Sequence, residues 1–210
     1  MTFTATNTGA STSAKLKLLH VGCGSSPRER LPFVFQHPNW QEVRYDIDPA
    51  VCPHLVGSIT DMSSVPDASM DAIWSSHNLE HLNSFEVPTA LAEFRRVLKP
   101  TGFVLISLPD MLSIAKLVVD DALGETLYES PAGPIRPLDM IFGHQAAIKA
   151  GNNFMAHRTG FTATTLGNAL ADAGFDEVRV HEGTRWDLWA VATMPDTDAS
   201  VFYDLADVMQ

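Results

Sequence analysis

Short apolar runs separated by turn-forming residues recur along the chain. Residues 16–21 carry apolar side chains at four of six positions and lead into a glycine turn, which predicts a buried strand. Residues 42–49 alternate polar and apolar side chains and stop at a proline, as a second strand does. Apolar runs at residues 54–57 and within 67–76 predict a third and a fourth strand.

Helical periodicity follows the fourth strand. Between residues 85 and 98 the apolar side chains recur at helical spacing, on Val87, Leu91, Phe94 and Leu98. Lys99, Pro100 and Gly102 are typical of the end of such a helix. Residues 103–108 are almost uniformly apolar, and this predicts a strand buried on both faces.

Other helices are predicted from shorter signals. Ser26, Pro27 and Glu29 fit an N-cap, a first-turn proline and a capping box, so a helix is expected over residues 28–35. The remaining pattern predicts helices at 111–123 and 162–173, strands at 176–181 and 186–194, and a loose terminal helix at 200–209.

The chain length of 210 residues suits one α/β domain with insertions. We expect a flexible tail over 1–14, one domain over 15–195, and a tail or short helix over 196–210. Residues 124–160 are rich in proline and glycine and are too long for an ordinary connection, which is typical of a lid or a binding segment. An interface with another subunit is an alternative for this insert, and the oligomeric state is left open.

Composition narrows the class of partner. The formal net charge of −11 argues against nucleic acid, because affinity for phosphate backbones comes largely from Lys and Arg. No apolar run reaches the roughly 20 residues that a membrane span needs. Two cysteines without metal-ligand spacing fit a reducing, cytoplasmic compartment. A small molecule or a protein is therefore the expected substrate.

The glycine turn predicts where a ligand binds. Gly22 and Gly24 allow the backbone to turn at the carboxyl end of the first strand, where nucleotide-like ligands bind. A dinucleotide fingerprint requires a third glycine, and Pro27 stands at that position, so a nicotinamide oxidoreductase is disfavoured. Asp46 and Asp48 follow at the end of the second strand, at the distance where a carboxylate accepts hydrogen bonds from ribose hydroxyls.

Five segments in order carry a family resemblance. They are Val21-Gly22-Cys23-Gly24, Asp46-Ile47-Asp48-Pro49, Ser58-Ile59-Thr60-Asp61-Met62, Ser76-His77-Asn78-Leu79-Glu80-His81-Leu82 and Phe94 to Gly102. Over residues 16–110 the chain resembles the class I S-adenosylmethionine-dependent methyltransferases, of the small-molecule type. The resemblance implies a Rossmann-like, mostly parallel seven-stranded sheet flanked by helices, with a C-terminal antiparallel hairpin and an inserted lid segment.

The resemblance also implies S-adenosylmethionine as cofactor and assigns residues to it. Asp61 would recognise the adenine amino group, and Met62 would pack on the ring. The full set of implied cofactor residues is Gly22, Cys23, Gly24, Asp46, Asp48, Asp61, Met62, Ser76 and His77. Ser25-Ser26-Pro27 and the second acid on the second strand depart from the family pattern and affect the detailed cofactor contacts.

The acceptor is not defined by the sequence, and two other functions stay open. If the acceptor must lose a proton, the candidate bases are His157, His144, His77 and Asp110. The chain could instead be a binding module that holds the cofactor without transfer. His77, Glu80 and His81 also match the His-x-x-Glu-His pattern of a zinc hydrolase, but they follow a strand directly, so we expect His77 in a loop and no metal ion at the site.

Overall fold

The computed structural model describes residues 14–206. A seven-stranded sheet forms its centre, with spatial order β3-β2-β1-β4-β5-β9-β8. The strands are β1 (Leu16–Val21), β2 (Trp40–Asp46), β3 (Leu55–Val56), β4 (Met70–Ser76), β5 (Leu98–Pro109), β8 (Val178–Glu182) and β9 (Asp187–Thr193). Strands β1 to β5 pair in parallel, whereas β9 runs antiparallel to both β5 and β8. The predicted mostly parallel sheet with a C-terminal hairpin is confirmed.

Alternation along the strands divides the core between the two faces of the sheet. Leu19 and Ile73 belong to the larger apolar cluster, while their neighbours Leu18 and Trp74 belong to a second cluster. Successive residues of a strand point to opposite faces, so a sheet covered on both sides needs apolar residues at consecutive positions. Residues 103–108 of β5 are almost uniformly apolar because both faces of this strand are buried.

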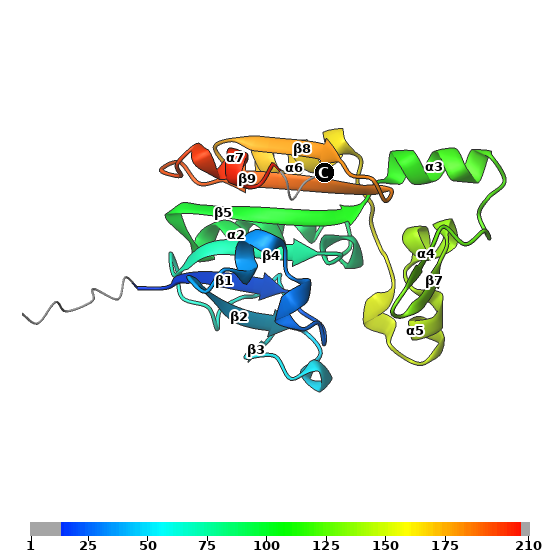
Figure 1. Cartoon of the computed structure of the whole chain (residues 1–210), viewed down its shortest axis with the longest axis horizontal. Helices are drawn as coiled ribbons and strands as arrows, with labels where there is room; N and C mark the ends of the chain where they lie inside the picture. Colours follow the sequence, from blue (N-terminus) through cyan, green and yellow to red (C-terminus); the bar gives the residue numbers. More distant parts are fainter. Residues whose placement is uncertain (1–13, 207–210) are drawn as a thin grey trace, which may run out of the picture.

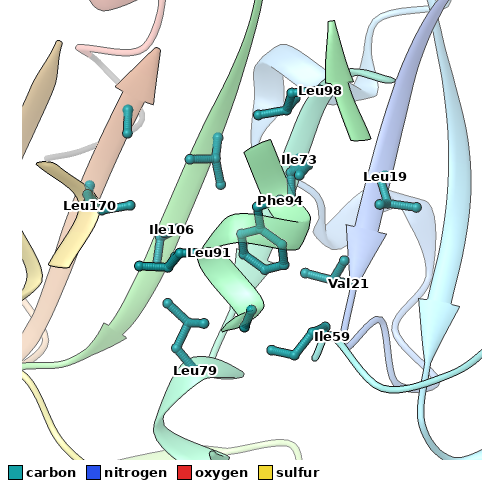
Figure 2. Packing of buried hydrophobic residues seen from close by; sticks show 14 of the residues in the cluster. Leu19, Val21, Ile59, Ile73, Leu79, Leu91, Phe94, Leu98, Ile106 and Leu170 are labelled. Carbon is teal, nitrogen blue, oxygen red and sulfur yellow. The ribbon is translucent and has the colours of Figure 1, made fainter. Parts of the chain in front are cut away.

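Helices α2 (Val87–Val97) and α6 (Ala163–Asp172) cover the face that carries the larger cluster. Phe94 of α2 is fully buried and projects from the helix between side chains of the central strands (Figure 2). The other face is covered by short segments, α1 (Phe33–Gln36) and α7 (Ser200–Asp204), which contribute Phe35 and Phe202. Both clusters support the same sheet, and its carboxyl edge is therefore rigidly placed.

The region after β5 extends past the carboxyl ends of the strands. Figure 1 shows α3 (Met111–Val119) leaving the sheet and α4 (Pro137–Phe142) and α5 (Gln145–Lys149) lying beyond the ends of β1, β2 and β4. A separate hairpin, β6 (Tyr128–Ser130) and β7 (Gly133–Ile135), belongs to the same region. The predicted insert over 124–160 is thus a folded unit that faces the edge where the sheet's loops gather.

Several predicted boundaries were wrong. Ser26 does not cap a helix, since Pro27 precedes a single 3-10 turn at Arg28–Arg30 and no side chain caps it. Strand β5 begins at Leu98 rather than at residue 103, because Leu98 already pairs with Met70 across a register shift. Helix α3 ends at Val119 instead of residue 123.

The expected terminal helix is also shorter than predicted, since α7 spans only Ser200–Asp204. Residues 207–210 of that prediction, and nearly all of the predicted 1–14 tail, lie outside the described residues. Among residues 14–206, none of the helices has the length and the apolar content to cross a membrane.

Candidate functional site

A crevice of about 320 Å³ opens at the carboxyl ends of β1, β2 and β4. Its floor and walls include five residues that the sequence had singled out for cofactor binding. These are Gly22, Gly24, Asp46, Asp48 and His77. The parallel strands explain the gathering, because their carboxyl ends meet at one edge and each is followed by a loop.

The glycine turn after β1 has the backbone shape that only glycine adopts freely. Gly22 and Gly24 have φ values of +61° and +51°. A Cβ on Gly22 would approach the Asn78 side chain to 2.9 Å, whereas a Cβ on Gly24 would meet nothing within 4 Å. Gly22 therefore permits close packing against Asn78, and Gly24 leaves space open toward the crevice.

A buried charge network holds this turn against β2. The Arg44 guanidinium donates to the carbonyl oxygens of Gly24 and Ser26, and it lies 3.6 Å from Glu42. Glu42 also contacts His20 at 2.8 Å. Burial raises the pKa of Glu42, but His20 and Arg44 outweigh burial, and the pKa is lowered. The turn is thus fixed by a cation, Arg44, that is itself held in place.

Asp46 links the turn to the second strand. Its carboxylate accepts hydrogen bonds from the backbone N–H groups of Gly24 at 2.8 Å and of Asp48 at 2.9 Å. Each oxygen has one further lone pair, so the carboxylate can still accept a hydroxyl from a ligand. Asp48 caps the following 3-10 turn, accepting from the Ala50 N–H.

Four predicted cofactor residues do not line this crevice. Cys23 is buried behind the turn, and burial raises the pKa of its thiol to about 11. Asp61 is exposed and accepts from the Ser63 N–H, while Met62 is fully buried in the larger cluster. Ser76 faces a second cavity instead. The adenine contacts implied for Asp61 and Met62 remain predictions.

The crevice also contains residues that sequence reasoning missed. Ile47, Val51 and Ile59 add an apolar surface beside Asp46. Among the residues that the structure describes, Asn78 Nδ2 is buried without a hydrogen-bond partner, and Arg158 brings an exposed guanidinium from the insert. Ile47 carried a usable signal, since it lies between two predicted ligand residues, but nothing in the local sequence places Arg158 here.

A second cavity, of about 450 Å³, lies on the other side of His77. Its aromatic residues include Trp74 and Trp189, whose rings stack with centroids 5.5 Å apart. Arg30 and Arg185 contribute positive charge. His77 is part of the lining of both cavities, which makes it the residue between them.

His77 has an unusual backbone for a non-glycine residue. Its φ is +48°, and its N–H donates to the Ser107 carbonyl of β5 at 2.8 Å. Such conformations persist where the surrounding structure enforces them, often at functional sites. Burial would lower the pKa of His77, but the Glu80 carboxylate at 3.3 Å and Asp187 outweigh it and raise the pKa.

The other candidate bases lie elsewhere. His157 comes from the end of the insert and is nearly buried, at 9% side-chain exposure, and burial lowers its pKa. His144 precedes α5 and does not line the crevice. Asp110 caps α3 by accepting from the N–H groups of Leu112 and Ser113, so its carboxylate is already committed.

The zinc-hydrolase arrangement is not formed by the predicted trio. That arrangement needs His77 and His81 on one face of a continuous helix. Here His77 lies in the loop directly after β4, as expected, and Leu79–His81 form a single 3-10 turn.

Comparison with known proteins agrees with this fold. Residues 19–106 match the model of a protein family described as a methyltransferase domain. This segment of the chain is therefore similar to a methyltransferase domain. It contains the glycine turn, Asp46 and His77.

Solved structures resemble most of the chain in fold. A SAM-dependent methyltransferase from Archaeoglobus fulgidus shares 15% identity over 85% of this chain and 86% of its own, with a TM-score of 0.57. One from Methanosarcina mazei shares 18% identity over 87% and 94%, with a TM-score of 0.56. No curated protein sequence matches the chain.

Proposed function

We propose that this chain transfers a methyl group from S-adenosylmethionine to a small-molecule acceptor bound in the second cavity. The observation that carries the proposal is the position of His77, which separates a crevice with nucleoside-binding chemistry from a cavity with aromatic and cationic lining. Methyl transfer needs cofactor and acceptor on opposite sides of one small junction, so that the acceptor atom lies in line with the S–CH3 bond.

The crevice residues suit the cofactor. The free lone pairs of Asp46 fit the ribose hydroxyls, and the apolar surface of Ile47, Val51 and Ile59 fits a purine ring. The unpartnered amide of Asn78 offers a donor to a buried polar atom. Arg158 offers a cation to the carboxylate of the amino-acid part of the cofactor.

The second cavity suits a small acceptor with an apolar body and an anionic group. The rings of Trp74 and Trp189 give an apolar surface, and Arg30 and Arg185 give positive charge around it. When bound, S-adenosylmethionine supplies a methyl group activated by the positive sulfur, so transfer breaks the S–C bond, forms the acceptor bond and leaves S-adenosylhomocysteine. His77 would orient the acceptor at the junction and would take a proton from it where the acceptor carries one.

Titration calorimetry with S-adenosylhomocysteine tests the cofactor half of the proposal. The expected result is micromolar binding that Asp46→Asn weakens about 10- to 100-fold, because the ribose loses a charged acceptor. Asp120→Asn removes an exposed carboxylate outside the crevice and is the matched control, with unchanged affinity expected. Absence of both binding heat and thermal stabilisation in the wild-type protein would overturn the proposal.

Transfer itself is tested separately from binding. Labelled S-adenosylmethionine is incubated with aromatic carboxylates and phosphates, and turnover is compared between wild type and His77→Ala. We expect a fall of about 10²- to 10⁴-fold in kcat at saturating cofactor. Tight cofactor binding without turnover on any acceptor would favour the non-catalytic binding module.

A further inference from the structure

Beyond the methyltransferase chemistry, one group of side chains beneath the crevice has no role. Glu80, His81 and His157 each offer one ligand-type atom, and these atoms all lie within 4.8 Å of one another. Glu80 and His81 belong to the turn after β4, whereas His157 comes from the end of the insert, so the cluster joins segments more than 70 residues apart.

The carboxylate of Glu80 is the first sign of a missing partner. Its side chain is 2% exposed, and neither oxygen has a hydrogen-bond partner in the described part of the chain. Its ion-pair contacts are His77 Nδ1 at 3.3 Å and His157 Nε2 at 4.0 Å. A buried carboxylate without donors is costly unless a cation or a proton neutralises it.

The histidines are the second sign. Nδ1 of His81 lies 3.1 Å from the Ala156 carbonyl oxygen, and Nδ1 of His157 lies 2.8 Å from that of Met140. A carbonyl oxygen only accepts, so Nδ1 carries the hydrogen in both rings and the Nε2 of each neutral ring keeps its lone pair. Metal-binding histidines are typically fixed in this way by a backbone carbonyl on the other nitrogen.

We propose that Glu80, His81 and His157 bind a divalent transition-metal ion of the zinc type. Two imidazoles and one carboxylate are a donor set that zinc takes, with a fourth position left for water or a ligand. Zinc bonds of about 2.0–2.2 Å require the three ligand atoms to move inward by roughly 1 Å at the widest separation, which side-chain rotation provides. Of the three ligands, His81 also lines the crevice.

Such an ion would also fasten the insert to the sheet. Backbone bonds already join the two segments, since the N–H groups of Arg158 and Thr159 donate to the Glu80 carbonyl at 2.8 and 3.2 Å. Coordination by His157 would add a side-chain link at the same place.

Zinc titration of tag-free, chelator-treated protein tests the site without any cofactor. Calorimetry is expected to give one Zn²⁺ per chain with micromolar or tighter affinity, and Co²⁺ is expected to give the visible absorption bands of a tetrahedral site. Glu80→Gln and His157→Ala should each weaken Zn²⁺ binding at least about 100-fold. His144→Ala removes a histidine of the same insert that lies outside the cluster, and it should bind as the wild type does.

Folding is checked independently of binding. If a variant loses its secondary structure by circular dichroism, the wild-type measurements still decide, because Zn²⁺ but not Mg²⁺ should raise the Tm by about 5 °C. Absence of stoichiometric Zn²⁺ in the folded wild type, or equal affinity in Glu80→Gln, would overturn the proposal and leave the cluster as an ion pair of Glu80 with a protonated histidine. Failure of S-adenosylhomocysteine binding would not affect this outcome, because the titration contains no cofactor.

Discussion

Two buried carboxylates beside the same crevice differ in how they are satisfied. Asp46 accepts two backbone N–H groups, and both donors come from residues within the loops that it joins. Within residues 14–206, Glu80 receives no backbone N–H on either oxygen, and its charged neighbours are His77 at 3.3 Å and the histidines His81 and His157. The carboxylate of Asp46 is therefore stabilised by backbone donors. The carboxylate of Glu80 must instead be neutralised by a cationic side chain or a bound metal ion.

The difference separates two ways of building a site. The glycine-turn half uses local backbone geometry, which forms as soon as β1 and β2 pair. The Glu80 half needs the insert to fold back before His157 arrives. Substitutions should therefore affect the two halves independently, except where they remove the core on which both depend.

The largest effect is expected from that shared core. Phe94 is fully buried in the cluster that lies under both halves, so Phe94→Ala should reduce the free energy of unfolding by about 3–5 kcal/mol. Phe85, which is 76% exposed, provides the matched control, and Phe85→Ala should change the free energy of unfolding by less than about 0.5 kcal/mol. Urea denaturation followed by circular dichroism measures both, and equal effects would contradict the packing described here.

A crossed experiment asks whether the halves are independent. We expect Asp46→Asn to weaken S-adenosylhomocysteine binding by about 1.5–3 kcal/mol and to leave Zn²⁺ affinity within threefold. Glu80→Gln should show the reverse, with Zn²⁺ binding lost and S-adenosylhomocysteine affinity retained within threefold. Calorimetry on both variants with both ligands gives four dissociation constants. If each substitution strongly weakens the binding of both ligands, the two halves of the site are coupled.

The support of the glycine turn should depend on pH. The pKa of Glu42 is lowered in the fold, despite burial, mainly by His20. Its contribution to stability is therefore present above the unfolded pKa and is lost as the pH falls through the lowered, folded pKa. Glu42→Gln should reduce stability by about 1–3 kcal/mol at pH 7, and the difference from wild type should shrink toward pH 3. A difference that stays constant with pH would exclude the charge of Glu42 as its source.

The smallest expected effect is on the chemical reactivity of Cys23, which is buried in the glycine turn. Burial raises the pKa of Cys23 to about 11, so only about one thousandth of this thiol is ionised at pH 8. Cys52 is exposed. Iodoacetamide at pH 8 should therefore modify Cys52 rapidly and Cys23 at least about 100-fold more slowly, measured by intact mass. Fast modification of the Cys52→Ser variant would show that the turn opens in solution.

Elements with a strong local pattern were predicted well. The apolar stripe of Val87, Leu91 and Phe94 predicted α2 because one helix face must be buried, and all three residues are buried. Gly22, Gly24 and Asp46 were predicted to share a crevice because parallel strands bring their carboxyl ends together, and all three line it. Helix ends were less predictable, since Ser26 and Pro27 have the composition of a cap without its geometry.

The sequence by itself determined most of the strands and the glycine turn of the crevice, because strand alternation and turn chemistry act between near neighbours, and its family resemblance implied the mostly parallel sheet. Only the tertiary structure decided that Met62 belongs to the core, that His77 lies between two cavities and that His157 meets Glu80. These relations depend on how a long insert returns across the edge of the sheet. Packing over such distances is set by the whole core, and no local pattern records it.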